Sequence, residues 1–250
     1  MIITVANQKG GVGKTTTAVT LAHGLAVQGR QVLLVDLDPQ GHCAVALGLD
    51  PEPGIFDWLV RERPLPRIVR ATGRAGLTLL PGDKKNGSAI SFLIVEHRGA
   101  VPLDLLRRAL PTGPDYIILD TSPSATELQA AAFHAADLLL IPAACDFLSE
   151  DGVARTMETI ALAAGANPPE IAVLPTFFDE RTRESKRVLD EYRAHLGDRV
   201  LAPIHAATRF REAAAQGRTI FEVEPEGRPA REYAALVWWV RGERGEGADR

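Results

Sequence analysis

The chain has few cysteines, no long apolar run and no excess of positive charge, and each shortage excludes a class of protein. Its two cysteines, Cys43 and Cys145, stand far apart and form no CxxC pair, which excludes a disulfide scaffold and a cysteine-rich metal site. No stretch approaches the roughly 18 apolar residues of a membrane helix. A net charge of −4 argues against a surface coated with nucleic acid and leaves room only for a local basic patch. We therefore expect a cytoplasmic globular protein with two free thiols.

Short β-branched runs alternate with longer helical stretches along the 250 residues. This alternation predicts a single-domain α/β fold, with a mostly parallel sheet covered by helices on both faces. We find no internal repeat and no linker, so one domain is expected over residues 1–240. Residues 241–250 are rich in glycine and charge and predict a disordered polar tail. The predicted strands are 2–6, 32–36, 77–80, 116–120, 138–142 and 171–175.

Helix ends are marked by residues that cap helices. The first helix is expected from Lys14 to near Gly29, a natural glycine after a helix end. Ser124 with Glu127 three positions later is a capping box, and a further helix is expected from about Ser149. Two more are predicted at 183–196 and 229–241. The first ten residues, MIITVANQKG, predict a buried strand and not a signal peptide.

The segment NQKGGVGKTTT, residues 7–17, joins the first predicted strand to the first predicted helix. In that context glycines let backbone N–H groups surround phosphate oxygens, and the helix N-terminus adds positive partial charge. Lys14 is expected to reach the β- and γ-phosphates, and the Thr15 hydroxyl to ligate Mg²⁺. The predicted nucleotide cradle is Lys9, Gly10, Gly11, Val12, Gly13, Lys14, Thr15 and Thr16.

This loop departs from the ordinary G-x-x-x-x-G-K-[ST] pattern, because Gln8 replaces the first glycine and Lys9 adds a second cation. KGGVGKTTT resembles the deviant Walker A motif of the ParA/MinD family of P-loop ATPases. The likeness continues through residues 33–49, 115–142 and 175–182, and it is nearer to the ParA and Soj branch than to MinD. The resemblance implies an ATPase with ATP and Mg²⁺ as cofactors.

The same resemblance gives the second lysine a role. In this family the signature lysine crosses the interface of an ATP-sandwiched homodimer and contacts the nucleotide of the partner, and Lys9 stands at that position. A cation acting in trans stabilises the triphosphate only after two subunits meet, which couples ATP to dimerisation. The catalytic residues that the resemblance implies are Lys9, Lys14 and Asp38.

Three aspartates close predicted strands. Asp36 and Asp38 end the second strand and Asp120 ends another, where ligands bind in open α/β sheets. Asp120 has the Walker B form and is expected to hold Mg²⁺, through water. The resemblance places Asp38 in switch I, where it positions the attacking water, and we place Asp36 in the second coordination shell of the metal.

The residues after switch I depart from the family pattern. His42 and Cys43 stand where small polar residues are typical. We expect a packed, inert pair.

The stretch IHAATRFREAA, residues 204–214, resembles the nucleotide-base loop I-P-R-N-V-R-L-S-E-A-P of the family. His205 and Ala207 fall where the proline and asparagine near adenine would be. Arg209 matches an arginine that ParA-type dimers use for non-specific DNA binding, and Arg211 and Arg218 extend the expected patch. Four nearby glutamates argue against DNA binding at these arginines. The alternative interpretation is a charged surface that contacts only solvent.

The resemblance implies a protein that moves or positions DNA or another cargo, with hydrolysis stimulated by a ParB-like partner and nucleoid association in the ATP-bound state. Two alternatives remain: a nucleotide-gated binding module with little turnover, and a MinD-like or flagellum-type positioning regulator. Membrane binding is not expected, because the polar tail has no apolar face. Trp238 and Trp239 precede that tail and are expected in the core.

Overall fold

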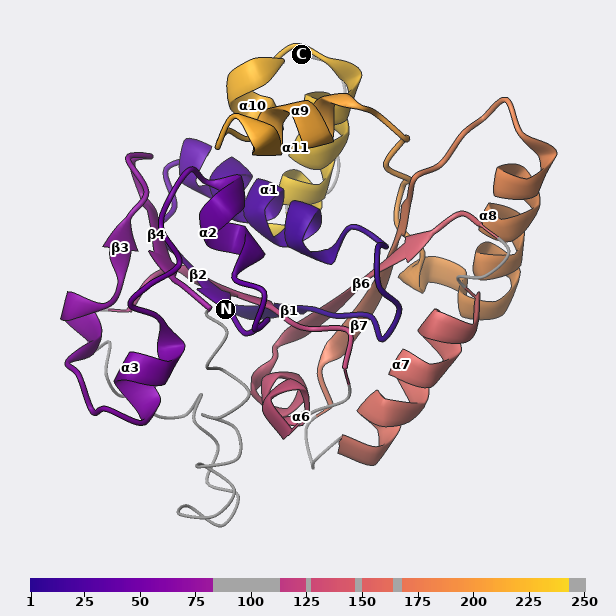
Figure 1. Ribbon diagram of the computed structural model, residues 1–250. Helices are drawn as coiled ribbons and strands as arrows, with labels where there is room; N and C mark the ends of the chain where they lie inside the picture. The colour runs from indigo at the N-terminus through magenta and orange to yellow at the C-terminus, as the bar shows by residue number, and fades with distance from the viewer. Residues whose placement is uncertain (83–112, 125–126, 147–149, 164–167, 243–250) are drawn as a thin grey trace.

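The computed structural model describes residues 1–82, 113–124, 127–146, 150–163 and 168–242 (Figure 1). Its strands are β1 (Ile2–Val5), β2 (Val32–Asp36), β3 (Arg70–Ala71), β4 (Leu77–Leu80), β5 (Tyr116–Asp120), β6 (Leu138–Ala144) and β7 (Glu170–Thr176). Its helices are α1 (Lys14–Val27), α2 (His42–Ala46), α3 (Ile55–Leu59), η1 (Leu65–Arg67), α6 (Glu127–Ala135), α7 (Glu150–Ala163), α8 (Arg183–Leu196), η3 (Gly197–Arg199), α9 (Arg209–Ala215), α10 (Ile220–Val223) and α11 (Arg228–Val240).

The strands form one seven-stranded sheet in the order β3-β4-β2-β5-β1-β6-β7. All pairs are parallel except β3 with β4 at one edge. The strands predicted at 32–36, 77–80 and 116–120 are confirmed with the same bounds, while β6 and β7 run past their predicted ends and β1 stops one residue early. The two-residue strand β3 was not predicted, because so short a run carries no periodic signal.

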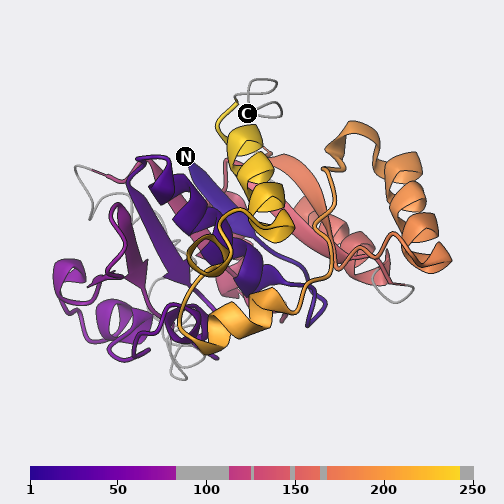
Figure 2. The ribbon, with the colours of Figure 1, turned by 90° about the horizontal axis from the view of Figure 1, so that it is seen from above.

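Helices cover both faces of the sheet (Figures 1 and 2). On one face Leu138 and Leu140 of β6 pack in a cluster with residues of α1 and α11. Leu139 and Ile141 point the other way and join a cluster with residues of α6, α7 and α8. This alternation confirms the predicted α/β fold with apolar residues on both faces of its strands.

The helix end predicted at Gly29 is confirmed, and the structure adds a cap that was not predicted. Gly29 has a left-handed φ of 77° just beyond α1, and Thr182 caps α8 by accepting a hydrogen bond from the backbone of Ser185. The capping box predicted at Ser124 includes residues 125–126, the predicted start at Ser149 falls on residues 147–149, and most of the predicted tail falls on residues 243–250. These three ranges lie outside the described residues. Among the helices that are described, none has the length and apolar character to span a membrane.

Candidate nucleotide site

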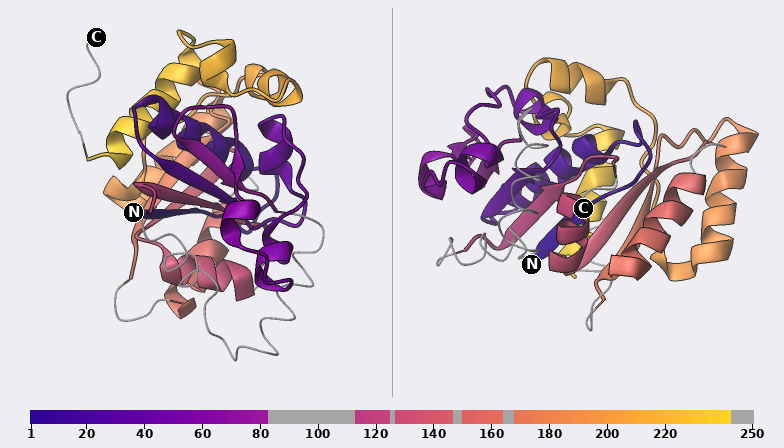
Figure 3. Two further views of the ribbon diagram at one scale, coloured as in Figure 1. Left: turned by 90° about the vertical axis from the view of Figure 1, so that its left-hand side faces the viewer. Right: turned by 60° about the horizontal axis from the view of Figure 1, so that its bottom comes forward.

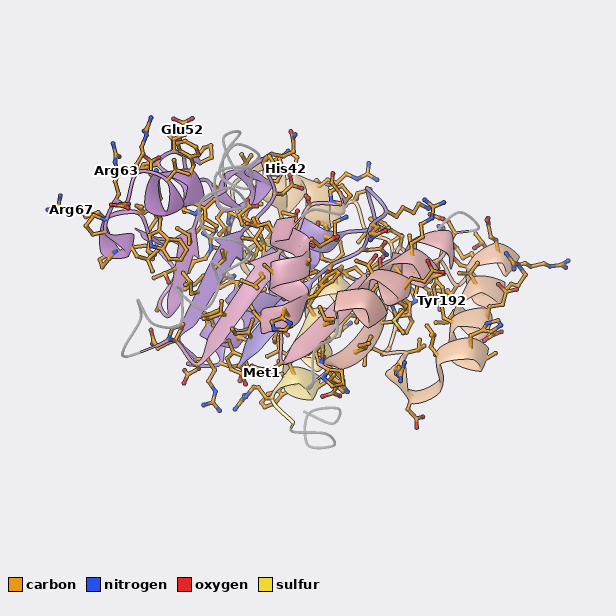
Figure 4. All side chains as sticks on the ribbon, turned by 90° about the horizontal axis from the view of Figure 1, so that it is seen from below. Met1, His42, Glu52, Arg63, Arg67 and Tyr192 are labelled. Atoms are coloured by element: carbon orange, nitrogen blue, oxygen red, sulfur yellow. The ribbon has the colours of Figure 1, made fainter. Side chains whose placement is uncertain are left out.

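Three central strands bring the predicted site residues to one edge of the sheet. In the register of the sheet, Asp120 at the end of β5 is paired with Val5 of β1 and with Asp36 of β2. The glycine loop follows β1 directly, so it lies at the same edge of the sheet, at the carboxyl ends of the strands. The views of Figure 3 show the ribbon with the yellow C-terminal helix and the pink helices on opposite sides of the sheet. Figure 4 labels His42, which lies beyond this edge, and Met1, which lies at the opposite side of the sheet.

The loop is shaped by left-handed glycines and closes around Lys14. Gly11 and Gly13 have φ values of 76° and 88°, which residues with a Cβ atom rarely adopt. The side chain of Lys14 is buried, and its Nζ donates to the backbone oxygen of Lys9 at 2.8 Å. Burial lowers the pKa of Lys14, and the carboxylates of Asp120 and Asp38 oppose this shift. The loop thus holds a cation at the start of α1, where left-handed glycines and a helix N-terminus favour the binding of an anion.

Lys9 is held differently. Its Nζ pairs with Asp146 Oδ1 at 2.9 Å, and its backbone N–H donates to Asn7 Oδ1 at 2.8 Å. Gly152 of α7 lies against it, so close that a Cβ atom there would stand 2.9 Å from Lys9 Cβ. Within the single chain, the second lysine is therefore packed against the segment that follows β6. A role across a dimer interface requires it to exchange Asp146 for the nucleotide of the partner.

Behind the loop lies a buried cluster of two carboxyls and a thiol. One ligand atom from each of Asp36, Cys43 and Asp120 lies within 4.8 Å of the others. Asp36 accepts backbone N–H groups with both oxygens, from Asp38 and from Cys43, each at 3.0 Å. Burial raises the pKa of Asp36 well above its usual range, and the neighbouring Asp120 adds to this shift. Asp36 thereby fixes the start and the end of the switch segment 38–43.

Asp120 offers a place for a divalent cation. Its Oδ2 accepts the Cys43 thiol at 3.3 Å. Its Oδ1 is buried and has no hydrogen-bond partner in the described part of the chain. Burial raises the pKa of Asp120 to about 6, an effect that Thr15 and Cys43 oppose. A buried carboxylate oxygen without a partner is costly unless a ligand completes it, and hard cations such as Mg²⁺ prefer oxygen ligands. The residues therefore fit the Mg²⁺ predicted at Thr15 and Asp120.

A cavity of about 750 Å³ lies at the same edge of the sheet and is lined by Asp38, His42 and Ser122, the chain neighbours of this cluster. The glycine loop and Asp38 form one wall, and residues from the 204–214 stretch form another. Its volume falls in the range of pockets for small molecules and cofactors. The lining residues include Gly10, Gly11, Gly13, Lys14, Thr15, Thr16, Asp38, His42, Ser122, Phe177, His205, Ala207, Phe210, Arg211 and Tyr233.

His205 lines the cavity through a fixed imidazole. Arg228 contacts its Nε2, and because a guanidinium can only donate, Nε2 is the acceptor. The Nδ1 atom then carries the proton and donates to Glu232 Oε1 at 2.6 Å. Glu232 also accepts the backbone N–H of His205 at 2.9 Å. His205 stands where the family has a proline, and this polar network orients its imidazole ring. Ala207, at the position of the family asparagine, supplies no polar side chain.

The pair after switch I differs from its expectation. His42 is exposed and lines the cavity, so its predicted packing is wrong. Cys43 is buried as expected, but its thiol contacts Asp120. The reason is that α2 begins here, which turns one side chain toward solvent and the next toward the sheet.

The three arginines expected to bind DNA do not share one environment. Arg209 pairs with Glu212 at 2.7 Å and Glu224 at 3.5 Å. Arg218 is exposed and donates to a backbone oxygen. Arg211 lines the cavity, and its guanidinium has no partner in the described part of the chain.

Several lining residues were not predicted. Phe177 stands in a left-handed conformation with φ 52° and keeps 43% of its surface exposed. It belongs to the motif at 175–182, which was a signal that could have marked it. Tyr233 comes from α11 and carried no such signal. Near it, Trp239 packs against the core as expected, while Trp238 lies under the Arg241 guanidinium, 4.8 Å from ring centre to carbon.

The fold and this site define a P-loop nucleotide-binding protein. A family model described as an AAA domain matches residues 1–173. The chromosome partitioning protein ParA of Caulobacter vibrioides is 35% identical over 88% of this chain and 85% of its own length. The chromosome-partitioning ATPase Soj of Thermus thermophilus is 37% identical over 94% of this chain and 93% of its own. The chain belongs to the ParA/MinD family of P-loop ATPases, as its motifs predicted.

A solved structure of a relative supports the same site. Cobyrinic acid a,c-diamide synthase from Mycobacterium smegmatis, with a bound ATP analogue and magnesium, is 29% identical. It matches with a TM-score of 0.79 over 98% of this chain and 97% of its own.

Proposed function

We propose that this chain is a ParA-like ATPase that dimerises around ATP, binds DNA non-specifically and partitions or positions chromosomal DNA, plasmid DNA or another cargo. The observation that carries the proposal is the cavity lined by the glycine loop, Lys14, Thr15 and Asp38, at the edge of the sheet where β5 ends in Asp120. Relatives with chromosome-partitioning names match over most of the chain and support the biological role.

Within the site each residue has one task. The glycine loop and Lys14 bind the phosphates, and Thr15 and Asp120 would hold Mg²⁺, which neutralises charge on the β- and γ-phosphates when bound. Asp38 borders the cavity with one oxygen accepting the backbone N–H of Gln40 at 2.9 Å. Its other oxygen is the group that we assign to orienting the attacking water.

Dimerisation is the proposed task of Lys9. In the single chain its ion pair with Asp146 is partly exposed, with 26% and 53% of the two side chains accessible. Such a pair contributes little, roughly 1 kcal/mol or less. Exchange of this partner for a triphosphate is therefore not opposed by a large energy.

DNA binding is assigned to the exposed arginines. Arg209 and Arg218 lie on and beside α9 and are open to solvent. Two subunits joined by ATP would present both sets together, and affinity rises steeply with each phosphate contact. The proposed location is therefore the nucleoid in the ATP state, with a ParB-like protein as the activating partner.

The proposal is tested by phosphate release with ATP and Mg²⁺, with and without duplex DNA. Slow turnover that rises with DNA and a ParB-like partner, and that Lys14→Ala abolishes, supports it. Nucleotide binding without turnover under all these conditions would instead favour a nucleotide-gated binding module.

A further inference from the structure

The thiol of Cys43 occupies a position that the proposed mechanism does not use. Cys43 is fully buried at the start of α2, yet it does not pack only against apolar neighbours. Its Sγ donates to Asp120 Oδ2 at 3.3 Å, and its backbone N–H donates to Asp36 Oδ2 at 3.0 Å. One residue therefore joins the end of the switch segment to both buried carboxyls.

The two oxygens of Asp120 are made different by this contact. Oδ2 has the thiol as a donor, whereas Oδ1 is buried with no hydrogen-bond partner among the described residues. A carboxylate without such a donor can rotate and present either oxygen. The Thr15 side chain also interacts with this carboxyl, and with the thiol on Oδ2 it is Oδ1 that is left without a partner for a ligand.

Asp36 in turn fixes the thiol. Its two oxygens accept the N–H groups of Asp38 and Cys43, so the segment between them is closed at both ends. A change in the path of the switch segment that moved Cys43 would also remove the donor from Asp120. Groups that orient metal ligands in this way often set metal affinity.

We propose that Cys43 is a positioning residue that holds Asp120 so that Oδ1 faces the Mg²⁺ of a bound nucleotide, and that it couples the switch segment to this carboxylate. The inference rests on the proposed nucleotide site. It requires a hydrogen-bond donor of about this size at position 43, and it does not require a thiol.

The test is nucleotide binding, measured by fluorescence of a methylanthraniloyl-labelled ADP during a Mg²⁺ titration and in excess EDTA. Cys43→Ala should raise the Mg²⁺ concentration for half-maximal binding about tenfold, while affinity in EDTA stays within about twofold of wild type. Cys43→Ser keeps a donor and should stay within about twofold at both conditions. Cys145→Ala, at the other buried cysteine, is the matched control and should titrate like wild type.

The possible outcomes distinguish a failure of this inference from a failure of the proposed function. If Cys43→Ala titrates Mg²⁺ like wild type, or if Cys43→Ser is as weak as Cys43→Ala, the positioning role is wrong and the nucleotide site stands. If wild type binds no labelled ADP with or without Mg²⁺, both the proposed function and this inference are wrong.

Discussion

Lys9 and Lys14 lie five residues apart in one loop, yet their surroundings differ. Lys14 is buried over the loop and donates to a backbone oxygen of that loop. Lys9 is partly exposed and pairs with Asp146 outside the loop. At the scale of single residues, this difference agrees with the proposal that Lys14 binds the nucleotide of its own chain and that Lys9 contacts the nucleotide of another chain.

The two lysines should therefore fail at different steps. Lys14→Ala should lower affinity for both ADP and ATP by roughly 100-fold or more, because a buried charged contact with the phosphates is lost. Lys9→Ala should leave ADP affinity within about threefold of wild type and lose only ATP-induced dimerisation. Isothermal titration with ADP and light scattering with ATP measure the two steps. Equal loss of ADP affinity in both variants would contradict this division.

Substitutions of the arginines in the 204–218 region should also have different effects. Both Arg209 and Arg211 are exposed, but Arg211 lines the cavity, whereas Arg209 does not and pairs with glutamates. We expect Arg211→Glu to weaken nucleotide binding several-fold, because it reverses a charge at the cavity wall.

Arg209→Glu is the matched variant and should remove ATP-dependent binding to arbitrary duplex while nucleotide affinity stays near wild type. Wild-type DNA binding should fall steeply between about 50 and 200 mM salt. Titrations with nucleotide and with duplex measure both variants. A wild type that ignores DNA at low salt with a non-hydrolysable ATP analogue would contradict the DNA assignment and favour a protein cargo.

At the scale of elements, the helices around α1 meet at a buried polar junction. His23 of α1 bonds through Nδ1 to the Thr219 hydroxyl at 2.6 Å, at the start of α10. Arg74 pairs with Glu222 of α10 at 2.8 Å and donates to the backbone oxygens of Leu47 and Gly217. These bonds tie the end of α2 to the α9–α10 segment, so both walls of the cavity depend on them.

This junction predicts a pH dependence of stability. Burial lowers the pKa of His23 below its ordinary value near 6.5, with Glu222 opposing the shift. The unfolded chain then binds more protons than the folded chain, so stability is complete above about pH 6.5 and is lost as pH falls through the folded pKa.

Urea unfolding at about pH 7.5 and 5.5 measures this loss. His23→Gln should show a smaller loss between the two pH values than wild type. The exposed His195 supplies the control, and His195→Gln should behave like wild type. An equal pH dependence in wild type and His23→Gln would rule out His23 as the source.

Elements with strong periodicity were predictable from the sequence. Buried strands such as β2 and β5 consist of continuous apolar runs that end in aspartate, so their bounds and their shared edge followed directly. The short helices α2 and α9 were not predicted, because five and seven residues give too little periodicity. This is why the different orientations of His42 and Cys43, and the turn of Arg211 into the cavity, appeared only in the structure.

Contacts between distant segments could also not be predicted from the sequence. Nothing in the sequence pairs Cys43 with Asp120, or Lys9 with Asp146, because each contact depends on the sheet order. The phosphate loop was predictable for the opposite reason, since its chemistry is local to one strand, one turn and one helix.

At the scale of the whole molecule, the proposed function makes this protein a switch in which ATP joins two chains. In this proposal each chain brings a glycine loop for the phosphates, Lys9 for the nucleotide of its partner and a set of exposed arginines on and beside α9. Hydrolysis would then separate the chains and release DNA, which gives ATP control over where the protein resides.

The most direct test is the mass of the protein in solution with ATP and Mg²⁺, measured by light scattering for Asp38→Ala. This variant should bind ATP but hydrolyse it slowly, and so should elute at twice the chain mass of 26.9 kDa. With ADP, or after adding Lys14→Ala, it should return to 26.9 kDa. If Asp38→Ala stays at the mass of one chain at saturating ATP, the ATP-gated dimer at the centre of the account is contradicted.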